Sequence, residues 1–295
     1  MNPSTVVYLN GEYVPAAEAK VSVLDRGFLF GDGVYEVIPV YRGTPFRLAE
    51  HLKRLDHSLI KIRIAPPLSH DKWHTILREL IKRNGGGDQS LYLQITRGTA
   101  PRDHAFPNNI PPTIVVMSNP IIPVESQLRN DGVSVITLDD FRWPFCEIKA
   151  ITLLPNVLAK QQAIDMGAHE AIFIRNGEVA EGTSSNLFIV KNRELITPPK
   201  SQYLLPGVTR DLVLELAAIH HIVAREQRLT LMDLQQADEI WLTSSIKEIM
   251  PVTRLNNKPV GNGLPGPLYS RMLAQYQDYK REARIAADLE RQESA

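Results

Sequence analysis

The first part of the chain alternates short apolar runs with turn signals, and two longer stretches follow in which apolar residues recur at spacings of three and four. Asn10-Gly11 and Arg42-Gly43 each follow an apolar run, which indicates a strand that ends in a turn. The spacing of three and four is typical of an amphipathic helix. These patterns predict strands at 6–9, 33–41, 91–96 and 113–117 and helices at 48–64 and 71–84.

The second half combines more strand signals with three helical stretches. Apolar runs separated by the turns at 176–177 and 191–193 predict an antiparallel meander between residues 171 and 197. Prolines bound the stretch after residue 119, which favours a linker there. The chain as a whole is predicted to be an α+β or α/β protein with two domains. We expect a smaller N-terminal α/β domain at 1–119, a linker at 120–132, and a larger, β-rich C-terminal domain with a charged helical tail at 133–295.

Composition limits the possible partners. Lys plus Arg and Asp plus Glu both total 33, so no global field would attract nucleic acid or an anionic membrane surface. Cys146 is the only cysteine, which excludes an intramolecular disulfide and a cysteine-rich metal site and fits a reducing compartment. No stretch of about 20 apolar residues could span a bilayer, so the chain is expected to be cytoplasmic. The balanced charge favours a small-molecule partner, and no metal is expected.

Lys149 is the first candidate for chemistry, because Ile148, Ala150 and Ile151 surround it with apolar neighbours in the sequence. Burial favours the neutral amine, which is the form that attacks a carbonyl carbon. The alternative is a lysine at a strand end whose ammonium reaches solvent. Lys160 is the obvious competitor, but its polar neighbours place it on a solvated helix face.

Several other residues suit a cofactor that carries an aromatic ring and a phosphate. Glu181 opens a run of small and hydroxyl-bearing residues and could pair with a ring nitrogen, although it could equally be an exposed hairpin residue. Gly207 precedes a helix whose first N–H groups could bind a phosphate, or could simply be capped. The remaining polar candidates are Arg54, Ser184, Ser185, Thr209, Ser244 and Ser245.

A long loop at 98–112 adds a second kind of candidate site. Arg102 and His104 could bind a carboxylate through charge-assisted hydrogen bonds, unless they belong to an ordinary solvated loop. Tyr35, in a predicted strand, could add a phenol donor or could be a packing residue.

These residues occur in an order that resembles the class IV aminotransferases, which depend on pyridoxal 5′-phosphate (PLP), and within them the D-amino acid aminotransferases. The resemblance covers most of the chain. Its motifs are Asp25-Arg26-Gly27, 30–36, Glu50-His51, Arg54-Leu55, 96–99, Arg102, His104, Ile148-Lys149, 158–161, Glu181-Gly182, 184–186, 207–211 and Thr243-Ser244. It implies the two-domain architecture called fold type IV.

The resemblance also implies a role for each candidate residue. Lys149 would be the Schiff-base lysine and would move a proton between the substrate Cα and the cofactor C4′, while Glu181 would hold the pyridine nitrogen. Leu205 would pack on the ring face. Ser184 and Ser185 would line the cofactor pocket. The phosphate would be surrounded by Arg54, Val208, Thr209, Ser244 and Ser245.

The choice of substrate rests on a carboxylate trap. In the D-specific enzymes a tyrosine, an arginine and a histidine hold the substrate carboxylate, and Tyr35, Arg102 and His104 match those positions. The resemblance implies that the arginine and histidine come from the neighbouring subunit of a homodimer. D-amino acids and 2-oxo acids would therefore be the substrates. Two departures bear on this expectation, because Pro206 replaces an expected lysine and Asp103 adds a negative charge within the trap.

Three alternatives stay open. The chain could be a branched-chain L-amino acid aminotransferase, although such an enzyme should not need the Arg-x-His pattern. It could be a lyase of the same fold, such as an aminodeoxychorismate lyase. It could also be a binding module without catalysis, in which Lys149 is a surface lysine.

Overall fold

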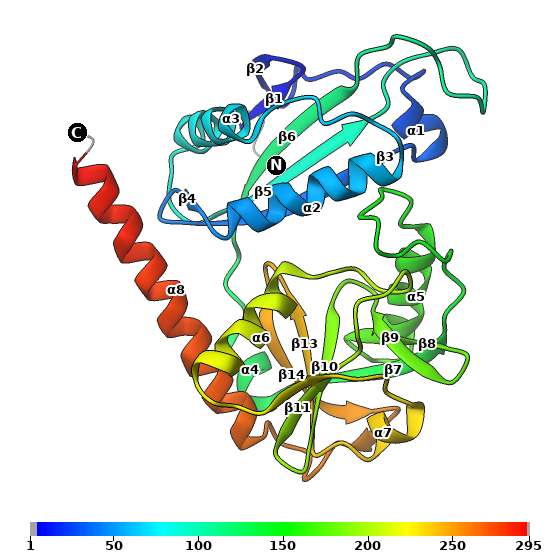
Figure 1. Cartoon of the computed structure of the whole chain (residues 1–295), viewed down its shortest axis with the longest axis vertical. Coiled ribbons are helices and arrows are strands. Elements are labelled where there is room, and N and C mark those ends of the chain that lie inside the picture. The colour runs from blue at the N-terminus through cyan, green and yellow to red at the C-terminus, as the bar shows by residue number, and fades with distance from the viewer. Residues whose placement is uncertain (1–4, 294–295) are drawn as a thin grey trace. The chain divides into compact units, whose positions relative to one another are not determined.

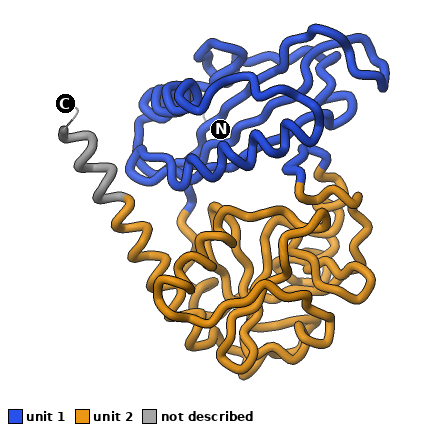
Figure 2. Tube along the Cα trace, viewed as in Figure 1, with its two compact units in different colours: residues 1–122, 148–152, 286–295 blue, residues 123–147, 153–285 orange. Residues whose placement is uncertain are grey.

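The computed structural model describes residues 5–293 and forms two compact units (Figure 2). The chain changes from the first unit to the second between Ile122 and Pro123. The short segment Ile148–Thr152 returns to the first unit, although the residues on both sides of it belong to the second. Lys149 and Glu181 are therefore carried by different units.

The first unit is built on a six-stranded antiparallel sheet with the order β2-β1-β6-β5-β3-β4. Two helices, α2 and α3, cover one face of this sheet (Figure 1). The strands are β1 (Val6–Leu9), β2 (Glu12–Pro15), β3 (Gly33–Tyr41), β4 (Thr44–Pro45), β5 (Gln89–Thr96) and β6 (Thr113–Pro120). The helices are α1 (Arg26–Phe30), α2 (Leu48–Lys61) and α3 (His70–Arg83).

Strand alternation divides the residues of β3 between two environments. Val34, Glu36 and Ile38 are fully buried, whereas Tyr35 and Val37 between them are only half-buried. Successive side chains of a strand point to opposite faces. The fully buried set packs in the core beneath α2 and α3, which leaves Tyr35 on the other face of the sheet.

The second unit contains a nine-stranded mixed sheet in which β12-β11-β10-β13-β14-β7-β8-β9 form a continuous path and β15 pairs with β14. Its strands are β7 (Val133–Asp139), β8 (Glu170–Arg175), β9 (Glu178–Gly182), β10 (Asn186–Lys191), β11 (Glu194–Thr197), β12 (Ala224–Glu226), β13 (Glu239–Ser244), β14 (Glu248–Leu255) and β15 (Lys258–Pro259). Its helices are α4 (Ser126–Asp131), α5 (Leu154–Asp165), α6 (Val208–Ile219), α7 (Leu231–Gln235) and α8 (Pro267–Glu293).

The expected fold class and the elements of the first unit are confirmed. Strands β1 and β3 have the predicted bounds, and α2 and α3 differ from their predictions by a few residues at their ends. Residues 120–132, expected as a linker, include the short helix α4.

The expected meander is wrong at one point, because β9 and β10, which follow one another in the chain, do not pair with each other. Strand β9 pairs with β8, whereas β10 pairs with β11 and β13. The buried Glu170 explains the break, since its Oε1 accepts hydrogen bonds from the Ser184 N–H and the Ser185 hydroxyl, both at 2.8 Å. These bonds turn the chain at the hydroxyl-rich run instead of extending the ladder.

Within residues 5–293, no helix combines the length and the apolar character needed to cross a membrane.

Candidate active site

Lys149 lies in the first unit, on a segment that extends the sheet beside the start of β3. Its carbonyl accepts a hydrogen bond from the Tyr35 N–H at 2.9 Å, and its own N–H donates to the Ser58 hydroxyl of α2 at 3.1 Å. Ile148 and Ala150 are buried, so the expected apolar setting is present. The backbone of Lys149 is thus fixed by both a strand and a helix.

The side chain of Lys149 is half-buried against an aromatic ring. Its Nζ lies 4.1 Å from the ring centroid of Tyr35, which is a cation–π distance for the protonated amine. Tyr35 in turn stacks on Tyr92, with ring centroids 5.6 Å apart. Burial raises the pKa of the Tyr92 phenol to about 12, and its hydroxyl donates to Gln94 Oε1 at 2.6 Å. Tyr35, with Tyr92 stacked against it, therefore forms a wall beside the lysine.

Arg54 is buried on α2 and is held by Glu36 of β3 through two hydrogen bonds. Arg54 Nε and Nη2 donate to the two carboxylate oxygens of Glu36, each at 2.7 Å. Burial alone would raise the pKa of Glu36, but the charge and hydrogen bonds of Arg54, together with His51, lower it to about 2. Glu36 is consequently ionised at neutral pH, and the arginine is held by a bidentate pair.

Arg26 binds the backbone of the loop that carries Arg102 and His104. This buried arginine donates to the Asp103 carbonyl at 2.5 Å and to the His104 carbonyl at 3.4 Å. It is itself paired with Asp32 at 2.8 Å. Burial would raise the pKa of Asp32, but hydrogen bonds from Arg97 and Arg26 lower it overall. An ion cluster thus holds the backbone of the loop and leaves the trap side chains exposed.

The side chains of Arg102 and His104 both lie against Phe30. The Arg102 guanidinium carbon is 5.3 Å from the Phe30 ring centroid, and the His104 ring centroid is 5.5 Å from it. The exposed Asp103 carboxylate accepts a hydrogen bond from the Ala105 N–H at 3.2 Å, within its own loop. Its negative charge is therefore directed at the loop backbone.

Glu181 lies in the second unit, where it is buried and bound by three donors. Arg142 Nη1 donates to Oε1 at 2.6 Å, while the Leu205 N–H and Asn186 Nδ2 donate to Oε2 at 3.0 and 3.2 Å. Arg142 is buried as well and pairs with Asp140 at 2.9 Å. The Glu181 carboxylate is thus held by a guanidinium that a second carboxylate also binds.

The start of α6 is a second polar feature of this unit. Its N-cap is Gly207, which has no side chain that could cap the first turn. A Cβ on Gly207 would lie 1.8 Å from Asn186 Oδ1, so only glycine allows this close approach. Val208 and Thr209 are buried in the first turn. The first N–H groups of a helix favour an anion such as phosphate.

Residues 33–255 match the protein family described as amino-transferase class IV. The chain belongs to the class IV aminotransferases. It is similar to the D-alanine aminotransferase of Bacillus licheniformis, with 42% identity across 89% of this chain and 92% of that protein. It is also similar to the D-alanine aminotransferase of Staphylococcus haemolyticus, with 36% identity across 93% of this chain and 98% of that protein.

Solved structures of branched-chain amino acid aminotransferases share the fold of this class IV aminotransferase. The T.th. enzyme in complex with N-(5′-phosphopyridoxyl)-L-glutamate has a TM-score of 0.87 and 29% identity, over 93% of both chains. The enzyme of Escherichia coli has a TM-score of 0.84 and 28% identity, over 92% of both chains. The expected family and fold type IV are thereby confirmed.

The structure places the predicted site residues of the aminotransferase in two groups, one on each unit. Tyr35 and Lys149 touch in the first unit, whose other predicted members are Arg54, Arg102 and His104. Those of the second unit are Glu181, Ser184, Ser185, Leu205, Val208, Thr209, Ser244 and Ser245. Ser244 and Ser245 are half-buried, at the end of β13 and directly after it.

Sequence reasoning missed four charged residues that support these groups. Glu36 and Asp32 belong to the recognised 30–36 motif but had no role assigned to them, and Arg26 belongs to another such motif. Arg142 lay outside every motif. Its one signal in the sequence is the acidic pair Asp139-Asp140 shortly before it, which is too common a pattern to single it out.

Lys160 differs from the expectation of a solvated lysine, because it is half-buried. Its Nζ donates to the His169 carbonyl, and Lys247 Nζ lies 3.0 Å from His169 Nε2. Burial and the nearby Lys247 both lower the pKa of Lys160. The ammonium of Lys160 thus has a structural contact with the backbone of the second unit.

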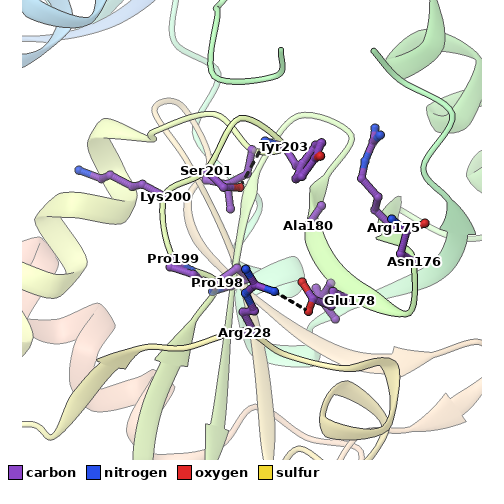
Figure 3. Close-up of a pocket in the computed structure, with 12 residues that line it drawn as sticks. Arg175, Asn176, Glu178, Ala180, Pro198, Pro199, Lys200, Ser201, Tyr203 and Arg228 are labelled. Atoms are coloured by element: carbon purple, nitrogen blue, oxygen red, sulfur yellow. Dashed lines mark hydrogen bonds and ion pairs between the residues drawn. The ribbon is translucent and has the colours of Figure 1, made fainter. Parts of the chain in front are cut away.

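A pocket of about 450 Å³ lies in the second unit between the start of β9 and the 198–204 segment (Figure 3). Each of its three cations is paired with a carboxylate: Arg175 with Asp140, Lys200 with Asp211 and Arg228 with Glu178. The pocket therefore offers a balanced charge instead of an anion site. Within the described residues, no group of three or more His, Cys, Asp or Glu side chains is placed to hold a metal ion.

Proposed function

We propose that this class IV aminotransferase uses PLP to exchange amino groups between D-amino acids and 2-oxo acids, with Lys149 as the residue that carries the cofactor. The observation that carries the proposal is the position of Lys149, fixed through its backbone and half-buried against Tyr35. It puts the reactive amine next to a phenol that can bind a carboxylate. A surface lysine in a non-catalytic binding module would not need a fixed backbone or a half-buried side chain.

The residues present fit PLP in their chemistry. Lys149 supplies an amine in an apolar setting, and Glu181 supplies a carboxylate that is bound by a buried guanidinium. The start of α6 has a glycine at its N-cap, so no N-cap side chain competes with a phosphate for the first N–H groups. Arg54, Ser244 and Ser245 add a guanidinium and two hydroxyls for the same phosphate.

When bound, PLP supplies an electron sink that stabilises negative charge at the substrate Cα. Lys149 would act as a general base and acid, moving a proton between the substrate Cα and the cofactor C4′. Glu181 would hold the proton at the pyridine nitrogen, with Arg142 paired to its carboxylate at 2.6 Å. Leu205 would pack against one face of the cofactor ring.

The choice of D-amino acids rests on the trap residues. Tyr35, Arg102 and His104 bind the substrate carboxylate, which directs the Cα proton toward Lys149 for one hand of substrate only. The fixed backbone of the loop and the inward hydrogen bond of the Asp103 carboxylate support this role. Two relatives named D-alanine aminotransferase support the substrate class.

A homodimer completes this proposal, because Arg102 and His104 would serve the neighbouring subunit. Both side chains are exposed in the described chain. Helix α5 also exposes Leu154, Val157 and Leu158 at 67%, 59% and 56%, an unusual surface for a protein that stays monomeric. Sedimentation of the purified protein would test the dimer. The cytoplasmic location stays a prediction from composition.

Branched-chain L-amino acid transamination is the second candidate, because the solved structures with TM-scores of 0.84 and above carry that name. The experiment that separates the two supplies 2-oxoglutarate with D-alanine or with L-leucine. The proposal predicts pyruvate from D-alanine and no oxo acid from L-leucine. The opposite result would make the second candidate the function.

A further inference from the structure

The carboxylate of Glu36 is fully buried in the first unit, and none of the residue's surface is exposed. It receives two hydrogen bonds from Arg54 at 2.7 Å and faces His51 Nδ1 at 2.8 Å. Because Glu36 is ionised, His51 Nδ1 carries the hydrogen and donates. All three side chains are therefore committed to one another in the core.

This cluster restrains Arg54 far more than packing would. Parallel hydrogen bonds between a guanidinium and a carboxylate fix the plane of the arginine as well as its position. His51 fixes the carboxylate in turn, and it stands three residues before Arg54 on the same face of α2. Burying these charges costs free energy that an apolar cluster of similar volume would avoid. Such a cost is consistent with a need for orientation.

The same helix face also holds the reactive lysine. Ser58 lies four residues after Arg54, and its hydroxyl accepts the Lys149 N–H at 3.1 Å. His51, Arg54 and Ser58 therefore form one stripe on α2 that contacts Glu36 on one side and Lys149 on the other. A rotation of this stripe would move the arginine and the lysine together.

We infer that Glu36 and His51 are positioning residues that orient Arg54 toward the cofactor phosphate. The inference rests on the proposed function, since it takes PLP as the cofactor and Arg54 as a phosphate ligand. Glu36 points to the face of β3 opposite Tyr35, so it acts through Arg54 and not on the substrate. Its contribution should appear only when the ligand carries a phosphate.

The test is a titration of the apoprotein with PLP and with pyridoxal, which lacks the phosphate, followed by visible absorbance. We expect Glu36→Gln to raise the Kd of PLP about 10-fold or more, as expected for disturbing one charge-assisted contact. The Kd of pyridoxal should stay within about 2-fold of wild type. Asp56→Asn is the matched control, because Asp56 also lies on α2 and also pairs with a histidine, His70, at 2.8 Å. It should leave both constants unchanged.

Variants of His51 keep the test decisive if Glu36→Gln does not fold. His51→Leu removes the donor to Glu36 and should weaken PLP but not pyridoxal, whereas His51→Asn restores a donor near Nδ1 and should recover PLP affinity. Equal weakening of both ligands, or of neither, would overturn the inference and leave the proposed function standing. A wild-type protein that binds neither ligand would overturn the proposed function, and the inference with it.

Discussion

Arg142 Nη1 lies 2.6 Å from Glu181 Oε1, and both side chains are buried. Asp140 holds the other side of the same guanidinium at 2.9 and 3.0 Å. Hydrogen bonds and charge from Asp140 and Glu181 outweigh burial and raise the pKa of Arg142, so it stays protonated. A permanent positive charge thus stands directly behind the carboxylate that we assign to the pyridine nitrogen.

Replacement of Arg142 should slow the chemistry more than it weakens binding. Without the guanidinium, Glu181 is less able to hold a proton at the pyridine nitrogen as charge develops. We predict that Arg142→Met lowers kcat about 10- to 100-fold, which is less than the roughly 100- to 1,000-fold of a group in direct contact with the developing charge, because Arg142 acts through Glu181. Steady-state kinetics with D-alanine would measure it.

Arg175→Met is the matched control for this prediction, since Arg175 pairs with the same Asp140 at 3.1 Å but not with Glu181. Its kcat should stay within about 3-fold of wild type. A larger loss in Arg175→Met than in Arg142→Met would show that Asp140, and not the contact with Glu181, is what matters.

Lys149→Ala should abolish turnover and the visible band of lysine-bound PLP while leaving the protein folded. The side chain is only half-buried, so its removal leaves no large cavity. Circular dichroism checks the fold and absorbance checks the cofactor. Lys160→Ala, which removes a lysine bound to the His169 carbonyl, should retain the band. Turnover by Lys149→Ala would remove Lys149 from the mechanism.

Arg102→Ala should raise the KM for D-alanine and for 2-oxo acids, because it removes a charge that binds the carboxylate. Loss of a hydrogen bond to a charged group corresponds to about 10- to 100-fold in affinity. The cofactor spectrum should not change. Asp103→Asn tests the neighbouring charge, and it should change KM less than about 3-fold because the carboxylate is turned to the Ala105 N–H. An unchanged KM in Arg102→Ala would contradict the trap.

Stability should fall in acid partly through Glu36. Its pKa is about 2 in the folded protein and near 4.5 when unfolded. The stabilisation is therefore complete above pH 4.5 and is lost as the pH falls toward 2, with a size on the order of 3 kcal/mol. Burial lowers the pKa of His51, so protonation of the unfolded chain below pH 6.5 acts in the same direction. Thermal melts from pH 7 to pH 3 should fall less steeply in Glu36→Gln than in wild type. Parallel curves would refute this assignment.

The sequence predicted the elements whose signals are local. Residues 33–41 form a strand with the expected bounds, because an apolar run there ends at a glycine turn. Strand β14 was not predicted, although it lies between β13 and β7. It contains Pro251, which argues against a central strand. The structure accommodates this proline because pairing with β7 begins only at Val252.

The candidate site likewise contains residues that local motifs identify and residues that only tertiary packing brings together. The motifs were sufficient to select Lys149 and Glu181, since they occur in a recognisable order along the chain. Arg142 is 39 residues from Glu181 in sequence, and their contact depends on the loop after β7 reaching the end of β9. Likewise, Glu36 meets Arg54 only because β3 packs beneath α2. Contacts of this kind come from tertiary packing, which no local pattern encodes.

The most direct test of the central claim is the absorbance spectrum of the purified, PLP-loaded protein before and after addition of D-alanine, with L-alanine and L-leucine run in parallel. We predict a visible band of lysine-bound PLP that converts to the pyridoxamine form with D-alanine and persists with both L-amino acids. Conversion by L-leucine but not by D-alanine would contradict the assignment of Tyr35, Arg102 and His104 as a trap for D-substrates. The absence of any band after loading would contradict the role of Lys149 itself.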